Sequence, residues 1–189
     1  MKNILLENPN CDIDNFRKYL LKFLGNENVK GKRILDLGCG YGWCEKSLLL
    51  KGAKEIVGVD ISISDIEIAK KLKNKSLHFY VASATKLPFK YSSFDTVVCW
   101  EVLEHLVRGT ENLLFKEVHR VLKPGGYLFL STPNKNILVS ILDPAWWTVK
   151  HRNYSKDQII NFASSTGFKI KDLQIQRVYR ESGLDWMMI

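Results

Sequence analysis

The stretch ILDLGCGYG at residues 34–42 joins a short apolar run to three closely spaced glycines, and a helical pattern follows from Trp43. Such an apolar run is typical of a strand buried in a parallel sheet. Glycines at 38, 40 and 42 allow the backbone to turn tightly and to touch a ligand, while the next helix presents unpaired N–H groups to an anion. The stretch therefore predicts a strand, a loop and a helix that bind a nucleotide-like cofactor.

Two other interpretations of the glycines are open. A dinucleotide-binding loop would place its third glycine at position 43, where this chain has Trp43, so the spacing disfavours a nicotinamide-dependent oxidoreductase. A glycine-rich turn without a ligand is the structural alternative, and the flanking strand and helix argue against it.

Asp60 closes the next apolar run, IVGVD at residues 56–60. A carboxylate at the end of a second strand can accept hydrogen bonds from both hydroxyls of a ribose. It could instead cap the helix that follows. Together with the glycine loop, Asp60 favours a nucleoside with a free sugar.

The rest of the chain alternates short apolar runs with amphipathic stretches, which predicts an α/β fold with a doubly wound, mostly parallel sheet and helices on both faces. The expected strands are Arg33–Leu37, Glu55–Val59, Leu77–Ala82, Phe94–Cys99 and Tyr127–Ser131, and the expected helices are Trp43–Lys51, Ser64–Asn74 and Thr110–Leu122. Further helices are expected over 12–24 and over 155–166, where Ser155 and Gln158 resemble a capping box, followed by a strand over 168–178.

Length and composition limit the function classes. With 189 residues, 46% of them hydrophobic and 25% charged, the chain predicts one globular domain over 1–189 and excludes a disordered protein. The net charge of +8 favours anionic partners in general, but the lysines at 70, 71, 73 and 75 follow helical spacing and indicate a solvated face rather than a nucleic-acid site.

The four cysteines lack the spacing of a zinc site or a disulfide framework, so no metal is expected. The first residues lack an apolar signal core, and no run is long enough to span a bilayer. These features fit a protein of the reducing cytoplasm.

Further motifs follow in order: ATKLPF at 84–89 with Phe94 and Asp95, LEH at 103–105, and VLKPGG at 121–126. Together with DLGCGYG at 36–42 and Asp60, they resemble class I S-adenosylmethionine-dependent methyltransferases that act on small molecules, similar to O-methyltransferases of quinone biosynthesis. The resemblance covers roughly residues 32–131. It implies a Rossmann-like sheet of about seven strands, the last of them short or missing.

The resemblance implies S-adenosyl-L-methionine as the cofactor. Its carboxylate suits the loop N–H groups, its ammonium suits Asp36 and its ribose suits Asp60. Ile61 would pack on the adenine, and Ser83 stands where the family usually has an acid that binds the adenine amine. The expected cofactor residues are Asp36, Gly38, Cys39, Gly40, Gly42, Asp60, Ile61, Ser83, Ala84 and Trp100.

Polar residues after the fourth expected strand are the candidates for proton transfer. His105 is the first candidate for a general base, because imidazole titrates near neutral pH, and Glu101 is the second. The LEH stretch also has a structural interpretation. A metal held by Glu101 and His105 is discounted, because no second pair of ligands is placed to complete the site.

The segment 134–152 interrupts the alternating pattern with Pro144, Trp146, Trp147 and the basic run from Lys150 to Arg152. It follows the fifth strand, at the edge where ligands bind in such folds, so an acceptor-covering insertion is expected. The tryptophans could line an acceptor pocket, make weak contact with a membrane surface, or pack in the core.

The sequence thus predicts a methyltransferase for a small-molecule acceptor, with an oxygen of a quinone precursor, a sugar or a lipid-linked metabolite as the first choice. Transfer to carbon or nitrogen, and a non-catalytic regulatory domain that binds the cofactor, are the alternatives. Base methylation is disfavoured, because the fourth strand lacks an Asn/Asp-Pro-Pro-aromatic element and Cys99 has no adjacent proline.

Overall fold

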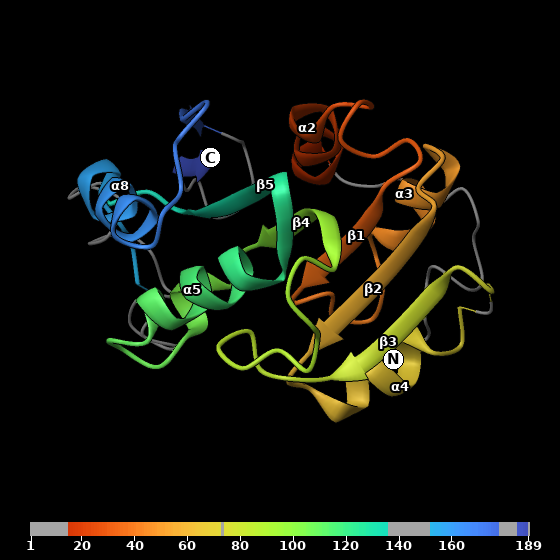
Figure 1. The fold of residues 1–189 in the computed structure, drawn as a ribbon. Helices are drawn as coiled ribbons and strands as arrows, with labels where there is room; N and C mark the ends of the chain where they lie inside the picture. Colours follow the sequence, from red (N-terminus) through yellow and green to blue (C-terminus); the bar gives the residue numbers. More distant parts are fainter. Residues whose placement is uncertain (1–14, 73, 136–151, 178–184, 189) are drawn as a thin grey trace.

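A central sheet organises the protein, as a computed structural model shows for residues 15–72, 74–135, 152–177 and 185–188. The strand order is β3-β2-β1-β4-β5-β7-β6. The first five strands pair in parallel, whereas β7 runs antiparallel to both β5 and β6 (Figure 1). The strands are β1 (Arg33–Leu37), β2 (Glu55–Asp60), β3 (Leu77–Val81), β4 (Phe94–Trp100), β5 (Leu122–Pro133), β6 (Gln174–Arg177) and β7 (Asp185–Met188).

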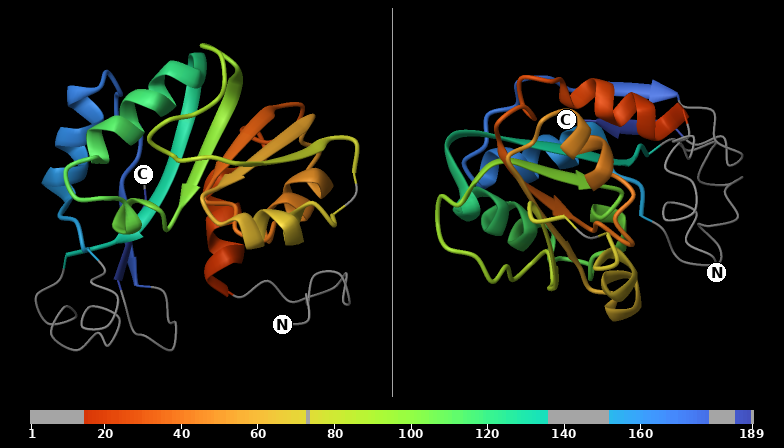
Figure 2. Two further views of the ribbon diagram at one scale, coloured as in Figure 1. Left: turned by 90° about the horizontal axis from the view of Figure 1, so that it is seen from below. Right: turned by 90° about the vertical axis from the view of Figure 1, so that its right-hand side faces the viewer.

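Helices cover both faces of this sheet, as the sequence predicts (Figure 2). Successive strand residues point to opposite faces, and Leu35 joins a core with residues of α5 and α8 whereas Ile34 joins a core with residues of α2 and α3. The helices are α2 (Asn15–Leu24), α3 (Glu45–Leu50), α4 (Ile63–Ala69), η1 (Leu103–His105), α5 (Glu111–Val121) and α8 (Lys156–Ser165). The prediction of a doubly wound, mostly parallel α/β fold is confirmed.

Most predicted elements are present, with ends that differ by a few residues. The capping box at α8 is confirmed: the Gln158 N–H donates to Ser155 Oγ at 3.3 Å, and the Ser155 N–H donates to Gln158 Oε1 at 2.9 Å. The fifth strand begins earlier than predicted, at Leu122, and its pairing with β4 shifts register between Phe94 and Thr96.

The predicted strand over 168–178 is wrong for residues 168–173, which have no regular secondary structure. The paired residues of β6 are Gln174 to Arg177, opposite β7. A strand needs a partner for its backbone groups, whereas the apolar side chains of Phe168, Ile170 and Leu173 are instead used to cover the larger core. A prediction from apolar content alone therefore made this strand too long.

The parallel strands bring their carboxyl ends to one edge of the sheet. Asp36 and Asp60 lie near the ends of β1 and β2, Glu101 follows β4, and Thr132 lies near the end of β5. The candidate site is built at this edge.

Candidate cofactor and acceptor site

The glycine loop after β1 is fixed to the end of the neighbouring strand. The N–H groups of Gly38 and Cys39 donate to the Val59 carbonyl at 2.8 and 3.1 Å. Gly38 has a φ of 73°, and a Cβ atom there would lie 2.3 Å from Val102 Cγ2. Gly40 has a φ of 53°, but a Cβ atom there would meet nothing within 4 Å. Packing thus requires glycine at 38, while open space at Gly40 lets a ligand approach the backbone.

Asp60 connects the loop to the second strand. Its Oδ2 atom accepts the Gly40 N–H at 2.9 Å, and its Oδ1 atom accepts the Ser62 N–H at 2.8 Å. Helix α4 is capped by Ser62, whose Oγ accepts the Asp65 N–H at 3.3 Å. Asp60 is therefore not the cap residue, and each of its oxygens has a further lone pair that suits a ribose hydroxyl.

Residues expected near an adenine lie on two adjacent segments. The Ala82 N–H donates to the Asp60 carbonyl at 2.9 Å, which keeps the end of β3 beside β2. Ser83 Oγ lies 2.9 Å from Thr85 Oγ1, and the side chain of Ile61 is 77% exposed. An exposed isoleucine beside a hydroxyl and the half-buried Ala84 fits the flat apolar faces and polar edge of a purine.

A pair of carboxyl groups lies beneath the loop. Asp36 and Glu45 are 1% and 0% exposed, and their side chains are hydrogen-bonded to each other. Burial, and then the carboxyls of Glu45 and Asp60, raise the pKa of Asp36 well above its usual value, and burial raises the pKa of Glu45 to about 7. The sequence prediction named Asp36 and missed Glu45, although an acid three residues before the buried Leu48 of a short helix was a usable signal.

Two other predicted cofactor residues lie in the core. The Cys39 side chain is buried with Ile66, Ala69 and Phe79, and Trp100 is 5% exposed within the core that α2 and α3 cover. Cys39 can therefore contact a ligand through its backbone, whereas Trp100 can contact one only through the edge of its indole ring. Their role in cofactor binding stays a prediction.

The end of β4 brings two acids together. Glu101 adopts a left-handed φ of 59°, and its N–H donates to the Ser131 carbonyl at 3.1 Å. Glu104 is 3% exposed and accepts a 3.1 Å hydrogen bond from Thr132 Oγ1. Burial raises the pKa of Glu104 to about 8, and the charge of Glu101 adds to the shift. His105 is exposed on η1.

Glu104 is a candidate that the sequence analysis missed. It belongs to the LEH stretch, but its neighbours Glu101 and His105 were chosen instead because burial cannot be read from that motif. One of its oxygens, Oε1, has no hydrogen-bond partner, and neither has the buried hydroxyl of Ser131 on β5. Unpaired buried polar groups of this kind often mark a functional site.

The chain leaves and re-enters the carboxyl end of β5 at the same place. The Tyr154 N–H donates to the Pro133 carbonyl at 3.0 Å, and the Lys135 N–H donates to the Tyr154 carbonyl at 2.9 Å. The ends of the expected acceptor-covering segment 134–152 therefore lie at the predicted edge. Residues 136–151, with Pro144, Trp146, Trp147 and Lys150, are outside the described residues, so their predicted roles stay predictions.

The side chain of Arg152 is bonded to other groups of the protein. Its Nη1 atom lies 2.6 Å from Glu111 Oε1, and its Nη2 atom donates to the carbonyls of Leu103 and Leu106. Arg152 belongs to the basic run of the expected acceptor-covering segment, and its guanidinium connects the chain that precedes α8 to η1 and α5.

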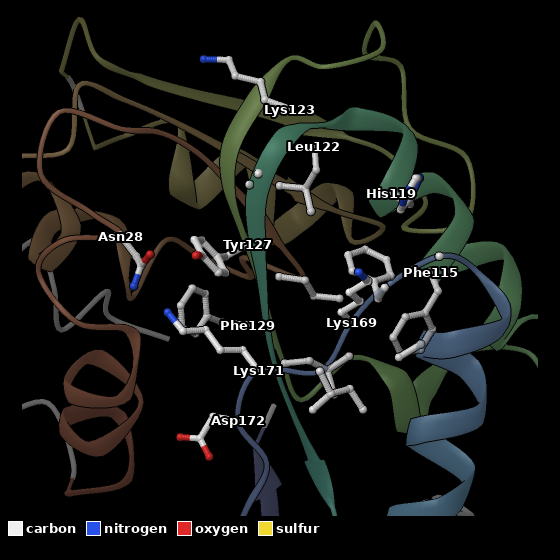
Figure 3. Close-up of a pocket in the computed structure, with 18 of the residues that line it drawn as sticks. Asn28, Phe115, His119, Leu122, Lys123, Tyr127, Phe129, Lys169, Lys171 and Asp172 are labelled. Atoms are coloured by element: carbon white, nitrogen blue, oxygen red, sulfur yellow. The ribbon is translucent and has the colours of Figure 1, made fainter.

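A cavity of about 1520 Å³ lies elsewhere (Figure 3). It is bordered by α2, the first part of β5 and residues 167–174, with Tyr127 and Phe129 projecting from β5 and Lys169 and Lys171 beside them. None of the predicted cofactor residues lines it. We assign the site to the carboxyl edge because the glycine loop and the buried acids are there, whereas the cavity has no comparable arrangement of groups.

Within the described ranges, no cluster of three metal-ligating side chains is present. The helices of these same ranges include none that is long and apolar enough to cross a membrane. Cys39, Cys44 and Cys99 are free thiols.

Known proteins match this chain in sequence and in fold. A family model described as a methyltransferase domain matches residues 35–130. The chain is 34% identical over 120 residues to a ubiquinone biosynthesis O-methyltransferase of Coxiella burnetii, covering 61% of this chain and 50% of the relative. A Pseudomonas syringae protein of the same name is 33% identical over 113 residues, covering 58% and 47%. The chain thus spans about half the length of these curated relatives.

Solved structures show the same fold over a larger part of the chain. A methyltransferase from Mesorhizobium loti superimposes with a TM-score of 0.74 at 20% identity, covering 90% of this chain and 94% of that one. The PH0226 protein of Pyrococcus horikoshii gives 0.74 at 24% identity, covering 100% and 97%.

The fold and the loop define a Rossmann-like methyltransferase domain. The chain belongs to the class I S-adenosylmethionine-dependent methyltransferase family. S-adenosyl-L-methionine is the cofactor of that family, and the open backbone at Gly40 and the acids Asp36 and Asp60 fit its amino-acid and ribose groups.

Proposed function

We propose that the protein transfers a methyl group from S-adenosylmethionine to an oxygen of a small-molecule acceptor, with a quinone precursor first and a sugar or lipid-linked metabolite next. The observation that carries the proposal is the glycine loop, which is hydrogen-bonded to Asp60 and open at Gly40 beside the buried Asp36. The names of the relatives favour a quinone precursor and oxygen as the acceptor atom.

The chemistry divides between the cofactor and the chain. Bound S-adenosylmethionine would supply a methyl group on a positively charged sulfur, which makes the methyl carbon reactive. The loop from Gly38 to Gly42 brings its backbone close to the amino-acid end, with open space at Gly40, and Asp60 orients the ribose. The residues of β5 and its carboxyl end border the space for the acceptor, where exclusion of water would favour transfer.

An acceptor hydroxyl must lose its proton. His105 remains the first candidate to take it and Glu101 the second, because both follow β4 at the carboxyl edge. Glu104 is buried and hydrogen-bonded to Thr132, so we infer that it positions these neighbours rather than touching the acceptor.

The proposal also covers the extent of the domain, the segment that covers the acceptor and the location of the protein. Residues 1–189 form one methyltransferase domain, with 134–152 as a segment that covers the acceptor. Trp146 and Trp147 contact the acceptor or, weakly, a membrane surface from which a lipid-linked acceptor is taken. The protein acts in the cytoplasm.

Isothermal titration calorimetry tests the cofactor part. S-adenosylhomocysteine should bind the purified protein and NAD should not, and Asp60→Ala should weaken binding by ten-fold or more, since it removes a charged hydrogen-bond acceptor. Absence of binding to S-adenosylhomocysteine would contradict the proposal.

Incubation with labelled S-adenosylmethionine and hydroxylated quinone precursors tests the reaction. Label on an acceptor oxygen supports the proposal, and label on carbon or nitrogen supports the alternative transferase. Tight cofactor binding without transfer to any tested acceptor favours a regulatory domain.

A further inference from the structure

The cavity of about 1520 Å³ is bordered by residues from both faces of the sheet. Phe23 of α2 belongs to the core on one face, and Phe115 of α5 belongs to the core on the other. Figure 3 shows Tyr127 and Phe129 on one side of β5 and Phe115 and His119 on the other. A continuous sheet would separate these two groups. A cavity that both groups border therefore marks a gap in the sheet itself.

The gap continues the line of β7. This strand pairs with β5 at Ser131 to Pro133 and with β6 at Gln174 to Arg177. Within the described ranges, no strand pairs with residues 127–130 of β5 on the β7 side. An edge of this kind presents unpaired N–H and C=O groups, which can bond to another extended chain.

Residues 168–172 form the opposite wall of the gap. Lys171 Nζ lies 4.9 Å from the ring centre of Tyr127, so this segment faces β5 across the gap. Because β5 and β6 both pair with β7, they are two strand spacings apart, which is roughly 10 Å. Residues 168–172 precede β6 directly, so the gap between them and residues 127–130 has the width of one strand.

The walls of the gap carry apolar side chains that are only partly covered. Leu128 of β5 and Ile170 of the opposite wall are half-buried and pack against the larger core. Tyr127 is 41% exposed, although a strand inside a parallel sheet is normally covered on both faces. Apolar side chains of an added strand would therefore extend the existing core.

The charges around the gap favour an acidic occupant. Four bordering lysines form no ion pair with a described acid, whereas Glu117 is paired with Arg120. Glu27 and Asp172 accept hydrogen bonds from amide groups of nearby side chains. A second copy of a chain with a net charge of +8 would be repelled by these cations. The lysines are Lys22, Lys116, Lys169 and Lys171.

We propose that the gap between residues 127–130 and 168–172 binds an extended acidic segment of a partner protein, which adds to the sheet as a strand in the line of β7. Backbone groups of the segment bond to the open edge of β5, its apolar side chains cover Leu128 and Ile170, and its carboxylates pair with Lys169 and Lys171. The inference does not depend on the proposed function, because none of the predicted cofactor residues borders the gap.

Fluorescence anisotropy with a labelled peptide tests the backbone and charge requirements. The peptide in which valine and glutamate alternate should bind the purified protein. Replacing its glutamates by lysines should weaken binding ten-fold or more, because the lysines of the gap would repel it. N-methylation of its backbone amides keeps the side chains but removes the donors, and should weaken binding to a similar extent.

Charge reversal locates the binding site. Lys169→Glu combined with Lys171→Glu should weaken the acidic peptide ten-fold or more and strengthen the lysine peptide. Lys70→Glu combined with Lys71→Glu is the matched control, because these exposed residues follow α4, which packs on β2 and β3. This control should change the affinity for the acidic peptide by less than two-fold.

Hydrogen exchange tests whether the gap is open in the free protein. Amides of residues 127–130 that face the gap should exchange at least ten-fold faster than those of residues 97–99 in β4, which has strands on both sides. The acidic peptide should slow the exchange of residues 127–130 and leave that of residues 97–99 unchanged.

Several results would overturn the inference. Failure of the acidic peptide to bind, equal binding of the lysine or N-methylated peptide, or unchanged affinity after charge reversal at Lys169 and Lys171 would each do so. Slow exchange of residues 127–130 in the free protein would show that the chain itself or a second copy fills the gap. Tighter binding of a single-stranded oligonucleotide than of the acidic peptide would indicate a nucleic-acid site instead. Because S-adenosylhomocysteine binding is measured separately, its failure would overturn only the proposed function.

Discussion

The glycine loop and the carboxyl end of β5 border the same edge of the sheet, but they are held in place by different kinds of contact. The hydrogen bonds that join the loop to the end of β2 stay within residues 38–62, because the Gly40 and Ser62 N–H groups donate to Asp60 and the Gly38 N–H donates to Val59. The end of β5 is fixed by groups from separate stretches, since Thr132 binds Glu104 and Tyr154 binds Glu111. The hydrogen bonds of the cofactor half therefore join segments that are closer along the chain than those joined in the acceptor half.

The largest expected effect comes from Gly38→Val in the cofactor half. Gly38 has a φ of 73°, and its Cβ would lie 2.3 Å from Val102 Cγ2. Strain at a positive φ and overpacking together should lower the free energy of unfolding by about 2–6 kcal/mol. Chemical denaturation measures this, and Gly40→Ala, which has open space, is the control with a loss of about 1 kcal/mol. Equal losses for the two variants would show that the loop is not held against Val102.

Glu104→Gln tests the acceptor half through pH. Because the pKa of Glu104 is raised to about 8, the folded state favours the protonated carboxyl, and its stability should fall as the pH rises from the ordinary carboxyl range towards 8. The wild type should thus lose up to about 3 kcal/mol relative to Glu104→Gln between pH 5 and 8. Thermal or chemical unfolding at several pH values checks this, and parallel curves for the two proteins would contradict it.

The failures of the sequence analysis follow the same division between local and long-range contacts. The spacing of the glycines and the position of Asp60 were sufficient to predict the loop, because each element lies beside the next along the chain. Glu104 was missed because its burial depends on groups such as Thr132 of β5, and no short motif encodes it. Glu45 was missed although its position three residues before the buried Leu48 was a usable signal.

The predicted strand over 168–178 failed at residues 168–173 for a related reason. Its apolar residues pack on the core, but their backbone lacks the strand partner that Gln174 to Arg177 find in β7. The competing roles of Asp60 could also not be separated in the sequence, because only the structure shows that Ser62 caps α4.

A smaller effect is expected when Arg152 is changed. Its guanidinium pairs with Glu111, which is 7% exposed, and with backbone carbonyls of η1. Arg152→Met should lower the free energy of unfolding by about 2 kcal/mol, because a largely buried acid loses its partner. Lys123→Met is the matched control: its pair with Asp95 is more exposed, so the loss should stay below about 1 kcal/mol. If the two variants lose the same stability, the Arg152 pair does not support the acceptor half more than a surface pair would.

The smallest effect on stability is expected for Ile61, although this residue makes a sharp test of the cofactor half. The side chain is 77% exposed, so Ile61→Ala should change the free energy of unfolding by less than about 0.5 kcal/mol. Contact with an adenine ring would bury that side chain, and its loss should weaken S-adenosylhomocysteine by roughly three- to ten-fold. Ile63→Ala, at a 64% exposed position two residues further on, should alter neither quantity. Equal ligand affinity for Ile61→Ala and the wild type would place the adenine away from the end of β2 and would leave Asp60 as the contact of this strand with the cofactor.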